Sequence, residues 1–269
     1  MVRAGGEHQR DGGEPVSTYV DGGVILVGVV AASLCGLFLV RWGLPHKVVK
    51  PHHDVTAAIF AITGTIYAVL LAFAVVIVWQ SFTDTQTTVT QEANAVADLD
   101  RISRGFPVVL RRQVHDEALT YAHVVILREW PLMANGGSSP EANAALIELW
   151  HAYTDMHGLQ QSSPLYGQSL TELNDITDDR RVRLLSSQSR VPTVMWAMLV
   201  LGGVVVVLFS FLFAVRSLWL HAVMTVMLSG MIALSLLLIY VLNGPFAGVV
   251  KVQPTAFVTT VNNMEHVQQ

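Results

Sequence analysis

Residues 192–242 read PTVMWAMLVLGGVVVVLFSFLFAVRSLWLHAVMTVMLSGMIALSLLLIYVL, and this stretch decides the fold. Apart from Arg216, which divides it, the stretch contains no Asp, Glu, Lys or Arg. A helix that crosses a bilayer needs about 20 consecutive apolar residues, and each half is at least that long. We therefore predict two crossings, at 192–215 and 218–242, that form a tight antiparallel hairpin.

Two further apolar blocks precede this pair, at 22–40 and 55–79. The first ends at Arg41-Trp42, a pairing suited to the membrane interface, and it exceeds the roughly 7–15 residues of a signal-peptide core. We expect it to stay in the mature protein. The sequence predicts an all-α protein with four transmembrane helices and a helical water-facing domain between the second and third. The segments outside the crossings are a polar tail at 1–21, the domain at 80–191 and a C-terminal tail at 243–269.

Composition agrees with a membrane protein and excludes several partners. The chain is 52% hydrophobic and 13% charged, whereas soluble chains are about 25% charged. With a net charge of −4 and scattered basic residues, no stripe that could follow a nucleic-acid backbone is present. The single cysteine, Cys35, permits no intramolecular disulfide. The lipid bilayer is the expected partner, and no cofactor is expected.

Four crossings place both termini and residues 80–191 on one side of the membrane. Basic residues near membrane helices favour the cytoplasm, but here they occur on both sides. The short loops carry Arg41, Lys47, Lys50 and Arg216, and the opposite side carries Arg180, Arg181, Arg183 and Arg190. We favour a multi-pass plasma-membrane protein with a cytoplasmic domain.

The domain at 80–191 is expected to be helical throughout. The second crossing continues without Pro or Gly to about Ser103, where Asp98 with Arg101 and Asp100 with Arg104 have the spacing of helical ion pairs. An amphipathic helix at 108–130 comes next, which Pro131 is expected to stop.

Two more helices are predicted in this domain. Ser139, followed by Pro140, looks like an N-cap. That helix should end near Gly158 and bury Leu146, Ile147, Trp150 and Tyr153. The last helix, at about 169–187, places Asp179 four residues before Arg183, the spacing of an ion pair.

No motif for catalysis or metal binding stands out. His46, His52, His53 and Asp54 lie in one short loop, but adjacent histidines rarely point at one ion, so a solvated loop is the preferred interpretation. His115, His123 and Glu129 cannot share one face of an ideal helix, and we interpret the two histidines as surface polar groups. Nucleophile, zinc and phosphate-loop motifs are absent, so we predict no enzyme and no metal site.

The first crossing carries Gly28, Ala32 and Gly36 at four-residue spacing. Small residues at this spacing let another helix approach closely, so we predict helix packing there.

The second crossing carries a polar stripe that continues into the domain. At 100° per residue, its members fall within a sector of about 80°, which Phe60 and Leu70 interrupt. Two interpretations remain: hydroxyls that bond to neighbouring helices or to their own carbonyls, or a water-lined path with Glu92 at its mouth. The pore-lining candidates of the second interpretation are Thr56, Thr63, Tyr67, Ala74, Val78, Ser81 and Glu92.

Several stretches resemble the bestrophin-like family of bacterial membrane proteins. They are 65–73 (TIYAVLLAF), 78–80 (VWQ), 91–94 (QEAN), 129–131 (EWP), 180–184 (RRVRL) and 244–248 (GPFAG). Bestrophins proper are pentameric ion channels with the same order of crossings, and their second crossing lines the pore. The resemblance implies, by analogy, a channel subunit.

Two features depart from the bestrophin pattern. Phe60 and Tyr67 lie two turns apart, where aromatic residues one turn apart are expected at the pore constriction. Residues 247–253 contain no carboxylate, so calcium gating is not implied. Our leading hypothesis is a homo-oligomeric channel for inorganic ions. The alternative is a non-conducting scaffold or sensor whose helical domain binds a protein partner.

Overall fold

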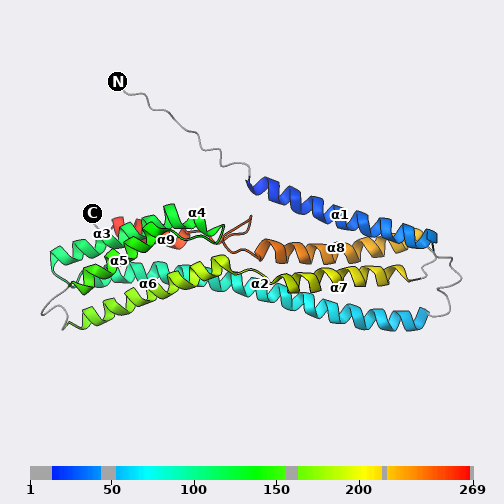
Figure 1. Cartoon of the computed structure of the whole chain (residues 1–269), viewed down its shortest axis with the longest axis horizontal. Coiled ribbons are helices and arrows are strands. Elements are labelled where there is room, and N and C mark those ends of the chain that lie inside the picture. Colours follow the sequence, from blue (N-terminus) through cyan, green and yellow to red (C-terminus); the bar gives the residue numbers. More distant parts are fainter. Residues whose placement is uncertain (1–13, 44–52, 156–162, 214–216, 267–269) are drawn as a thin grey trace, which may run out of the picture. The chain divides into compact units, whose positions relative to one another are not determined.

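The computed structural model describes residues 14–43, 53–155, 163–213 and 217–266, which form helices with short connections and no strand (Figure 1). The all-α prediction is confirmed. The helices are α1 Glu14–Gly43, α2 His53–Ser103, α3 Val108–Val124, the π-helix η2 Val125–Glu129, α4 Trp130–Met133, α5 Pro140–Thr154, α6 Pro164–Gln188, α7 Thr193–Phe211, α8 Leu218–Leu242 and α9 Thr255–His266.

The chain divides into two compact units. The membrane unit comprises residues 1–78 and 191–243, and the helical domain comprises 79–190 and 244–269. The second helix, α2, contributes to both. The predicted C-terminal tail is corrected, because residues 244–269 belong to the helical domain. There, α9 buries Phe257, Val261 and Met264.

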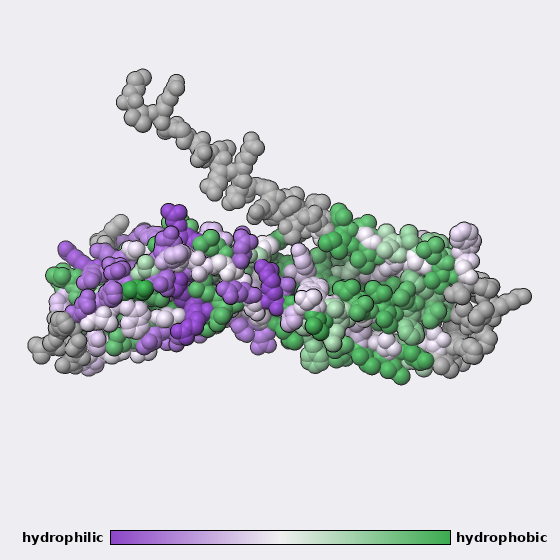
Figure 2. Space-filling view, in the orientation of Figure 1, coloured by the Kyte–Doolittle hydropathy of each residue, from purple (hydrophilic) through white to green (hydrophobic). Residues whose placement is uncertain are grey.

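Four helices are long and apolar enough to cross a membrane: Gly22–Gly43, Thr56–Ser103, Thr193–Phe211 and Leu218–Leu242. Large apolar side chains on them point outward. Ile62, Phe73, Met198 and Met227 are each more than 60% exposed. Figure 2 shows a mostly hydrophobic surface on the membrane unit and a mostly hydrophilic one on the helical domain. Such apolar surface is stable in contact with lipid or another subunit.

Small residues bring the membrane helices together. The Tyr67 ring of α2 lies against Gly202 and Gly203 of α7, where an added Cβ at Gly202 would come within 2.7 Å of the ring. The Tyr67 hydroxyl donates to the Leu199 carbonyl at 3.0 Å. Without a side chain at 202 or 203, α7 can approach α2 closely enough for this bond.

The helical domain has a conventional apolar core. Leu99 of α2, Val114 and Tyr121 of α3, Leu149 of α5 and Ile176 of α6 are fully buried, and they belong to one cluster. Several sequence predictions are confirmed here. Ser139 caps α5 by accepting from the Ala142 N–H at 3.2 Å, and the pairs Asp98–Arg101 and Asp100–Arg104 form.

Other local predictions are corrected. Ile147 is 44% exposed, and Leu149 takes the buried position instead. Helix α5 ends at Thr154 rather than near Gly158, and the next helix starts at Pro164, earlier than predicted. Pro131 does not stop its helix, because the π-turn of η2 precedes it and α4 continues to Met133.

Some sequence predictions lie outside the described residues. His46, His52 and Arg216 are among them, and so are the side chains of His53 and Asp54.

Candidate functional site

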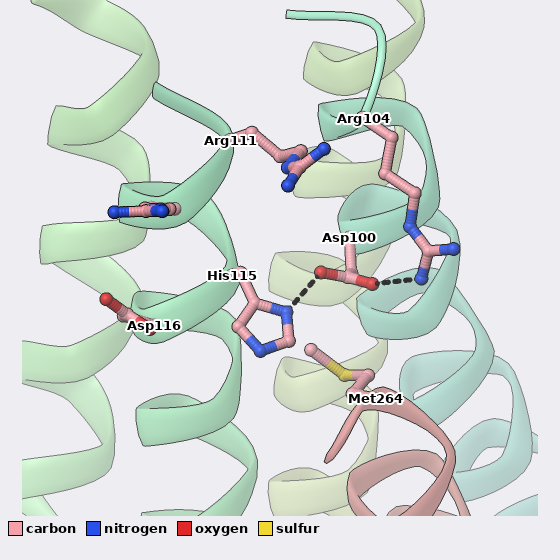
Figure 3. A pocket seen from close by; sticks show the side chains of 7 residues that line it. Asp100, Arg104, Arg111, His115, Asp116 and Met264 are labelled. Atoms are coloured by element: carbon pink, nitrogen blue, oxygen red, sulfur yellow. Dashed lines mark hydrogen bonds and ion pairs between the residues drawn. The ribbon is translucent and has the colours of Figure 1, made fainter. Parts of the chain in front are cut away.

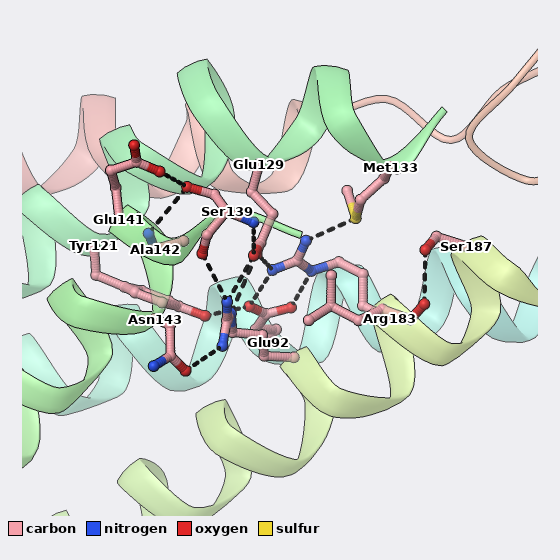
Figure 4. Close-up of polar contacts among 12 residues, drawn as sticks. Glu92, Tyr121, Glu129, Met133, Ser139, Glu141, Ala142, Asn143, Arg183 and Ser187 are labelled. Carbon is pink, nitrogen blue, oxygen red and sulfur yellow. Dashed lines mark hydrogen bonds and ion pairs between the residues drawn. The ribbon is translucent and has the colours of Figure 1, made fainter. Parts of the chain in front are cut away.

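Four charged side chains are buried together inside the helical domain (Figure 4). Glu92, Glu129 and Arg183 have no exposed surface, and Arg180 is 7% exposed. Glu92 comes from α2, Glu129 from the π-helix η2, and both arginines from α6. Two carboxylates and two guanidiniums thus face each other away from water. Buried charges are tolerated only when they are paired and hydrogen-bonded.

Arg183 is the centre of this cluster. Its Nε donates to Glu92 Oε2 at 2.6 Å, and its Nη2 donates to Glu92 Oε1 at 2.9 Å. The same Nη2 also donates to Glu129 Oε2 at 2.9 Å. The parallel bonds to Glu92 use the planar fork of the guanidinium, which favours bidentate pairing with a carboxylate. Arg183 therefore ties α6 to α2 and to η2.

Arg180 binds the other carboxylate of the cluster. Its Nη2 donates to Glu129 Oε1 at 2.6 Å, and its Nε donates to Glu129 Oε2 at 3.2 Å. Its Nη1 donates to the Asn143 side-chain oxygen at 3.2 Å. The Ser139 N–H donates to Glu129 Oε1 at 3.2 Å. These bonds add α5 to the helices that the cluster joins.

Tyr121 completes the ligand set of Glu92 from α3. Its hydroxyl donates to Glu92 Oε1 at 2.6 Å. Burial raises the pKa of Tyr121 well above its usual range, and the charge of Glu92 raises it further. The phenol therefore stays protonated and remains a donor to Glu92 at any physiological pH.

The ionic partners of Glu129 and Arg183 shift the pKa values of these two side chains. Burial raises the pKa of Glu129, but hydrogen bonds and charges from Arg180 and Arg183 outweigh burial and lower that pKa overall. Burial likewise lowers the pKa of Arg183, and the charge and hydrogen bonds of Glu92 outweigh it, so the pKa rises. Glu129 and Arg183 are therefore held in their charged forms.

The aromatic residues Trp130 and Phe257 cover Arg183. The guanidinium carbon lies 5.6 Å from the Trp130 ring centroid and 5.9 Å from that of Phe257. Both distances are within the range of cation–π attraction. Because Phe257 belongs to α9, the C-terminal helix takes part in enclosing the cluster.

The π-helix positions Glu129. The Trp130 N–H bonds to the Val125 carbonyl, five residues back, which places one additional residue in the turn. An inserted residue rotates the next part of the helix by about 100° relative to an ideal helix. Ideal-helix angles therefore did not predict that Glu129 would point into the core. The nearby Pro131, which lacks an N–H, was the available signal of an irregular turn.

Most of the predicted pore-lining residues face the interior of their own unit. In the membrane unit, Tyr67, Ala74 and Val78 are 6%, 0% and 3% exposed, and in the helical domain Glu92 is fully buried. Within the single subunit these four residues are covered by their own chain, and their place along a water-lined path stays a prediction. Thr56 and Thr63 are half-buried and Ser81 is exposed, so their role remains a prediction.

Only part of the predicted packing face of α1 packs against another helix of the same subunit. A Cβ on Gly36 would meet the Phe211 ring at 2.9 Å, so Gly36 packs against α7. Gly28 and Ala32 are exposed, and a Cβ on Gly28 would meet nothing within 4 Å. Packing at these two positions is not observed within the subunit, which leaves it as a prediction for a second subunit.

Two predicted roles of single residues also change. Arg183 does not pair with Asp179, because Glu92 and Glu129 offer it two buried carboxylates. His115 is not a surface residue: it is 7% exposed and lies 2.6 Å from Asp100. No group of three or more His, Cys, Asp or Glu side chains within the described ranges could hold a metal ion.

These observations define a class: a four-span helical membrane protein whose water-facing domain is held together by a closed ionic cluster. Within this class, the Bestrophin-like domain model matches residues 27–257, and the chain belongs to the Bestrophin-like family. No curated protein sequence matches the chain.

Solved structures agree with this assignment at the level of fold. A bacterial bestrophin homologue from Klebsiella pneumoniae that carries a point mutation is 16% identical with a TM-score of 0.70, over 92% of this chain and 99% of the homologue. Another structure of the Klebsiella homologue is 17% identical with a TM-score of 0.65, over 90% and 95% of the two chains. The full length of the fold is therefore shared.

Proposed function

We propose that the protein is a subunit of a homo-oligomeric ion channel in which α2 lines the conducting path. The observation that carries this proposal is a row of uncharged polar side chains on α2 that the helical domain leaves uncovered. Thr83, Gln86, Thr87, Thr90 and Gln91 line a shallow hollow of about 280 Å³. Hydroxyl and amide groups offer partners to hydrated ions without trapping them by charge.

The part of α2 in the membrane unit supports the same proposal. Ile62, Ile66, Val69 and Phe73 are 49–63% exposed, so the chain itself does not cover them. We call these four residues the open face of α2. In an oligomer, a ring of such side chains would form a hydrophobic constriction that gates by dewetting. Thr56, Thr63 and Ser81 remain candidates for the edges of the path.

The family assignment supports oligomerisation only by analogy with bestrophins proper. The exposed Gly28 and Ala32 of α1 offer a place where a second subunit can approach. Light scattering of the purified protein in detergent should give a mass of several subunits. A monomeric mass would contradict this part of the proposal.

A cytoplasmic domain in the plasma membrane is also part of the proposal. Of the basic residues that favoured this side, Arg180 and Arg183 are paired with buried glutamates, whereas Arg181, paired with the exposed Asp178, and Arg190 remain on the surface. A cysteine at the exposed Ser138, in a Cys35→Ser background, should resist impermeant thiol reagents in intact cells. Rapid labelling would place the domain outside.

Conduction is tested by a charge placed on the polar row. Purified protein in planar bilayers should show unitary currents, and Thr87→Lys should lower the permeability of cations relative to anions. Its control is Thr171→Lys on α6. Both threonines are exposed, and both donate to the carbonyl four residues back. Absence of current would favour the non-conducting scaffold, and equal selectivity changes in both variants would show that the polar row does not line the path.

A further inference from the structure

A polar hollow of about 610 Å³ lies in the helical domain and has no part in the proposed conducting path. Its walls come from α2, α3 and α9 (Figure 3). Three arginines, two aspartates, one histidine and one methionine line it: Arg104, Arg111, Arg112, Asp100, Asp116, His115 and Met264.

Asp100 is already fully engaged. Its Oδ1 lies 2.6 Å from His115 Nδ1, and its Oδ2 accepts from Arg104 Nη2 at 3.0 Å. The side chain of Asp100 is only 4% exposed, and each of its two oxygens already has one of these partners. Asp100 therefore fixes His115 and Arg104 in the wall of the hollow and does not neutralise further cations.

Arg111 and Arg112 have no carboxylate partner within the described part of the chain. Neither takes part in an ion pair, although Asp116 lies one helical turn after Arg112. Figure 3 shows Arg111 extending from α3 toward the gap that holds Asp100 and Arg104, whereas Asp116 points away from that gap. The gap thus receives the positive charge of Arg111 without a compensating anion.

His115 forms part of the wall beside Arg111. It is one turn after Arg111 on the same face of α3, and its Nε2 has no hydrogen-bond partner in the described structure. Because this nitrogen is buried, His115 supports the wall of the hollow and does not itself face a molecule inside it.

We propose that this hollow binds a small phosphorylated anion, with Arg111 and Arg104 as its recognition residues. A phosphate group carries close to two negative charges and several acceptor oxygens, so the guanidiniums of Arg104, in the turn after α2, and of Arg111, on α3, can bind it at once. The volume accommodates a solute larger than one phosphate, such as a pyrophosphate or a nucleoside triphosphate. Binding there does not depend on whether the protein conducts ions.

Calorimetric titration of the full chain in detergent tests the site, with inorganic pyrophosphate and ATP as probes. Both should bind and compete with each other. Arg111→Gln should weaken both by about tenfold or more, because it removes a hydrogen bond between charged groups. ATP that binds more tightly than pyrophosphate would identify the ligand as a nucleotide, and equal affinities would identify free polyphosphate.

The matched control is Arg101→Gln, which removes the same charge from the exposed surface of α2. Arg101 pairs with Asp98, its side chain is 71% exposed, and it does not line the hollow. This variant should bind as the wild type does. Absence of binding to the wild type, or equal weakening in Arg101→Gln and Arg111→Gln, would overturn the inference. Arg111 is exposed, and an unchanged melting temperature would show that its replacement leaves the fold intact.

Discussion

In the membrane unit, the buried polar side chains are hydroxyls and one imidazole, whereas the helical domain buries two glutamates and two arginines in one cluster. The membrane hydroxyls mostly bond within their own helix: Ser33 donates to Val29, Thr225 to His221 and Ser229 to Thr225. The charges of the helical domain bond between helices. Polar groups in the first unit are locally satisfied, and in the second they connect distant segments. Loss of one polar group should therefore cost little in the membrane unit and much in the helical domain.

The largest effect is expected for Glu92→Gln. The variant leaves Arg183 with one carboxylate in place of two and gives the buried cluster a net positive charge. Breaking a buried ion pair on one side costs about 3–5 kcal/mol, so the free energy of unfolding should fall by that amount. Thermal or denaturant unfolding of the full chain, followed by circular dichroism, measures it. Glu265→Gln, at a half-exposed carboxylate, should change stability little. Equal losses of unfolding free energy in both variants would show that the buried cluster stabilises the fold no more than an exposed carboxylate does.

A steric change should have the next largest effect, and it lies in the membrane unit. Gly202→Ala places a Cβ 2.7 Å from the Tyr67 ring, which its hydrogen bond to Leu199 holds in place. Overpacking of this kind costs about 1–3 kcal/mol. Gly64→Ala is the control, because nothing lies within 4 Å of its added Cβ. Unfolding in mixed detergents should separate the two variants, and identical curves would refute the tight contact.

Ser229→Ala tests the membrane unit, where the loss of one polar group should cost little stability. Ser229 is fully buried in α8, but its hydroxyl donates to the Thr225 carbonyl of the same helix at 2.8 Å. Polar contacts in membrane helices average about 0.6 kcal/mol, and a bond within one helix should be worth no more. The same detergent unfolding assay should show a loss at or below that value. A loss as large as that of Glu92→Gln would remove the contrast between the units.

A pH-dependent effect is expected for Asp179→Asn. Burial, with the nearby charge of Glu92, raises the pKa of Asp179 from 3.8 to about 6. The folded state then binds this proton more tightly than the unfolded state, so stability falls as pH rises through the interval between these values. Asp179→Asn should remove that fall and be the more stable protein above pH 6. Asp84→Asn, at an exposed carboxylate that is not among the charges that raise this pKa, should keep the wild-type pH profile.

The parts that the sequence predicted are those with local signals. Four long apolar blocks predicted the crossings, and the Ser139-Pro140 pair predicted the start of α5. The periodicity of α2 predicted a distinct polar face, but not whether that face points inward or outward. Both a packed face and a water-lined face contain hydroxyls, so the pattern alone does not distinguish them.

The ionic cluster could not be predicted because its partners are far apart in sequence. Glu92 and Arg183 are 91 residues apart. In the local sequence, Asp179 was the only carboxylate at the helical ion-pair spacing from Arg183. The π-turn at η2 further changes the direction of Glu129. The sequence analysis predicts a tail at 243–269, because the apolar residues of α9 become informative only beside Trp130 and Arg183.

The most direct test of the proposed conducting path compares two adjacent residues of α2 in the membrane unit. Phe73 is 63% exposed on the open face, and Ala74 is fully buried in the subunit. Each is replaced by cysteine in a Cys35→Ser background, and ion current is recorded before and after a charged thiol reagent. We predict that the reagent blocks current through Phe73→Cys and leaves Ala74→Cys unaffected. Block through Ala74→Cys alone would contradict the proposed path. It would instead support a path lined by the sector of α2 that contains Ala74.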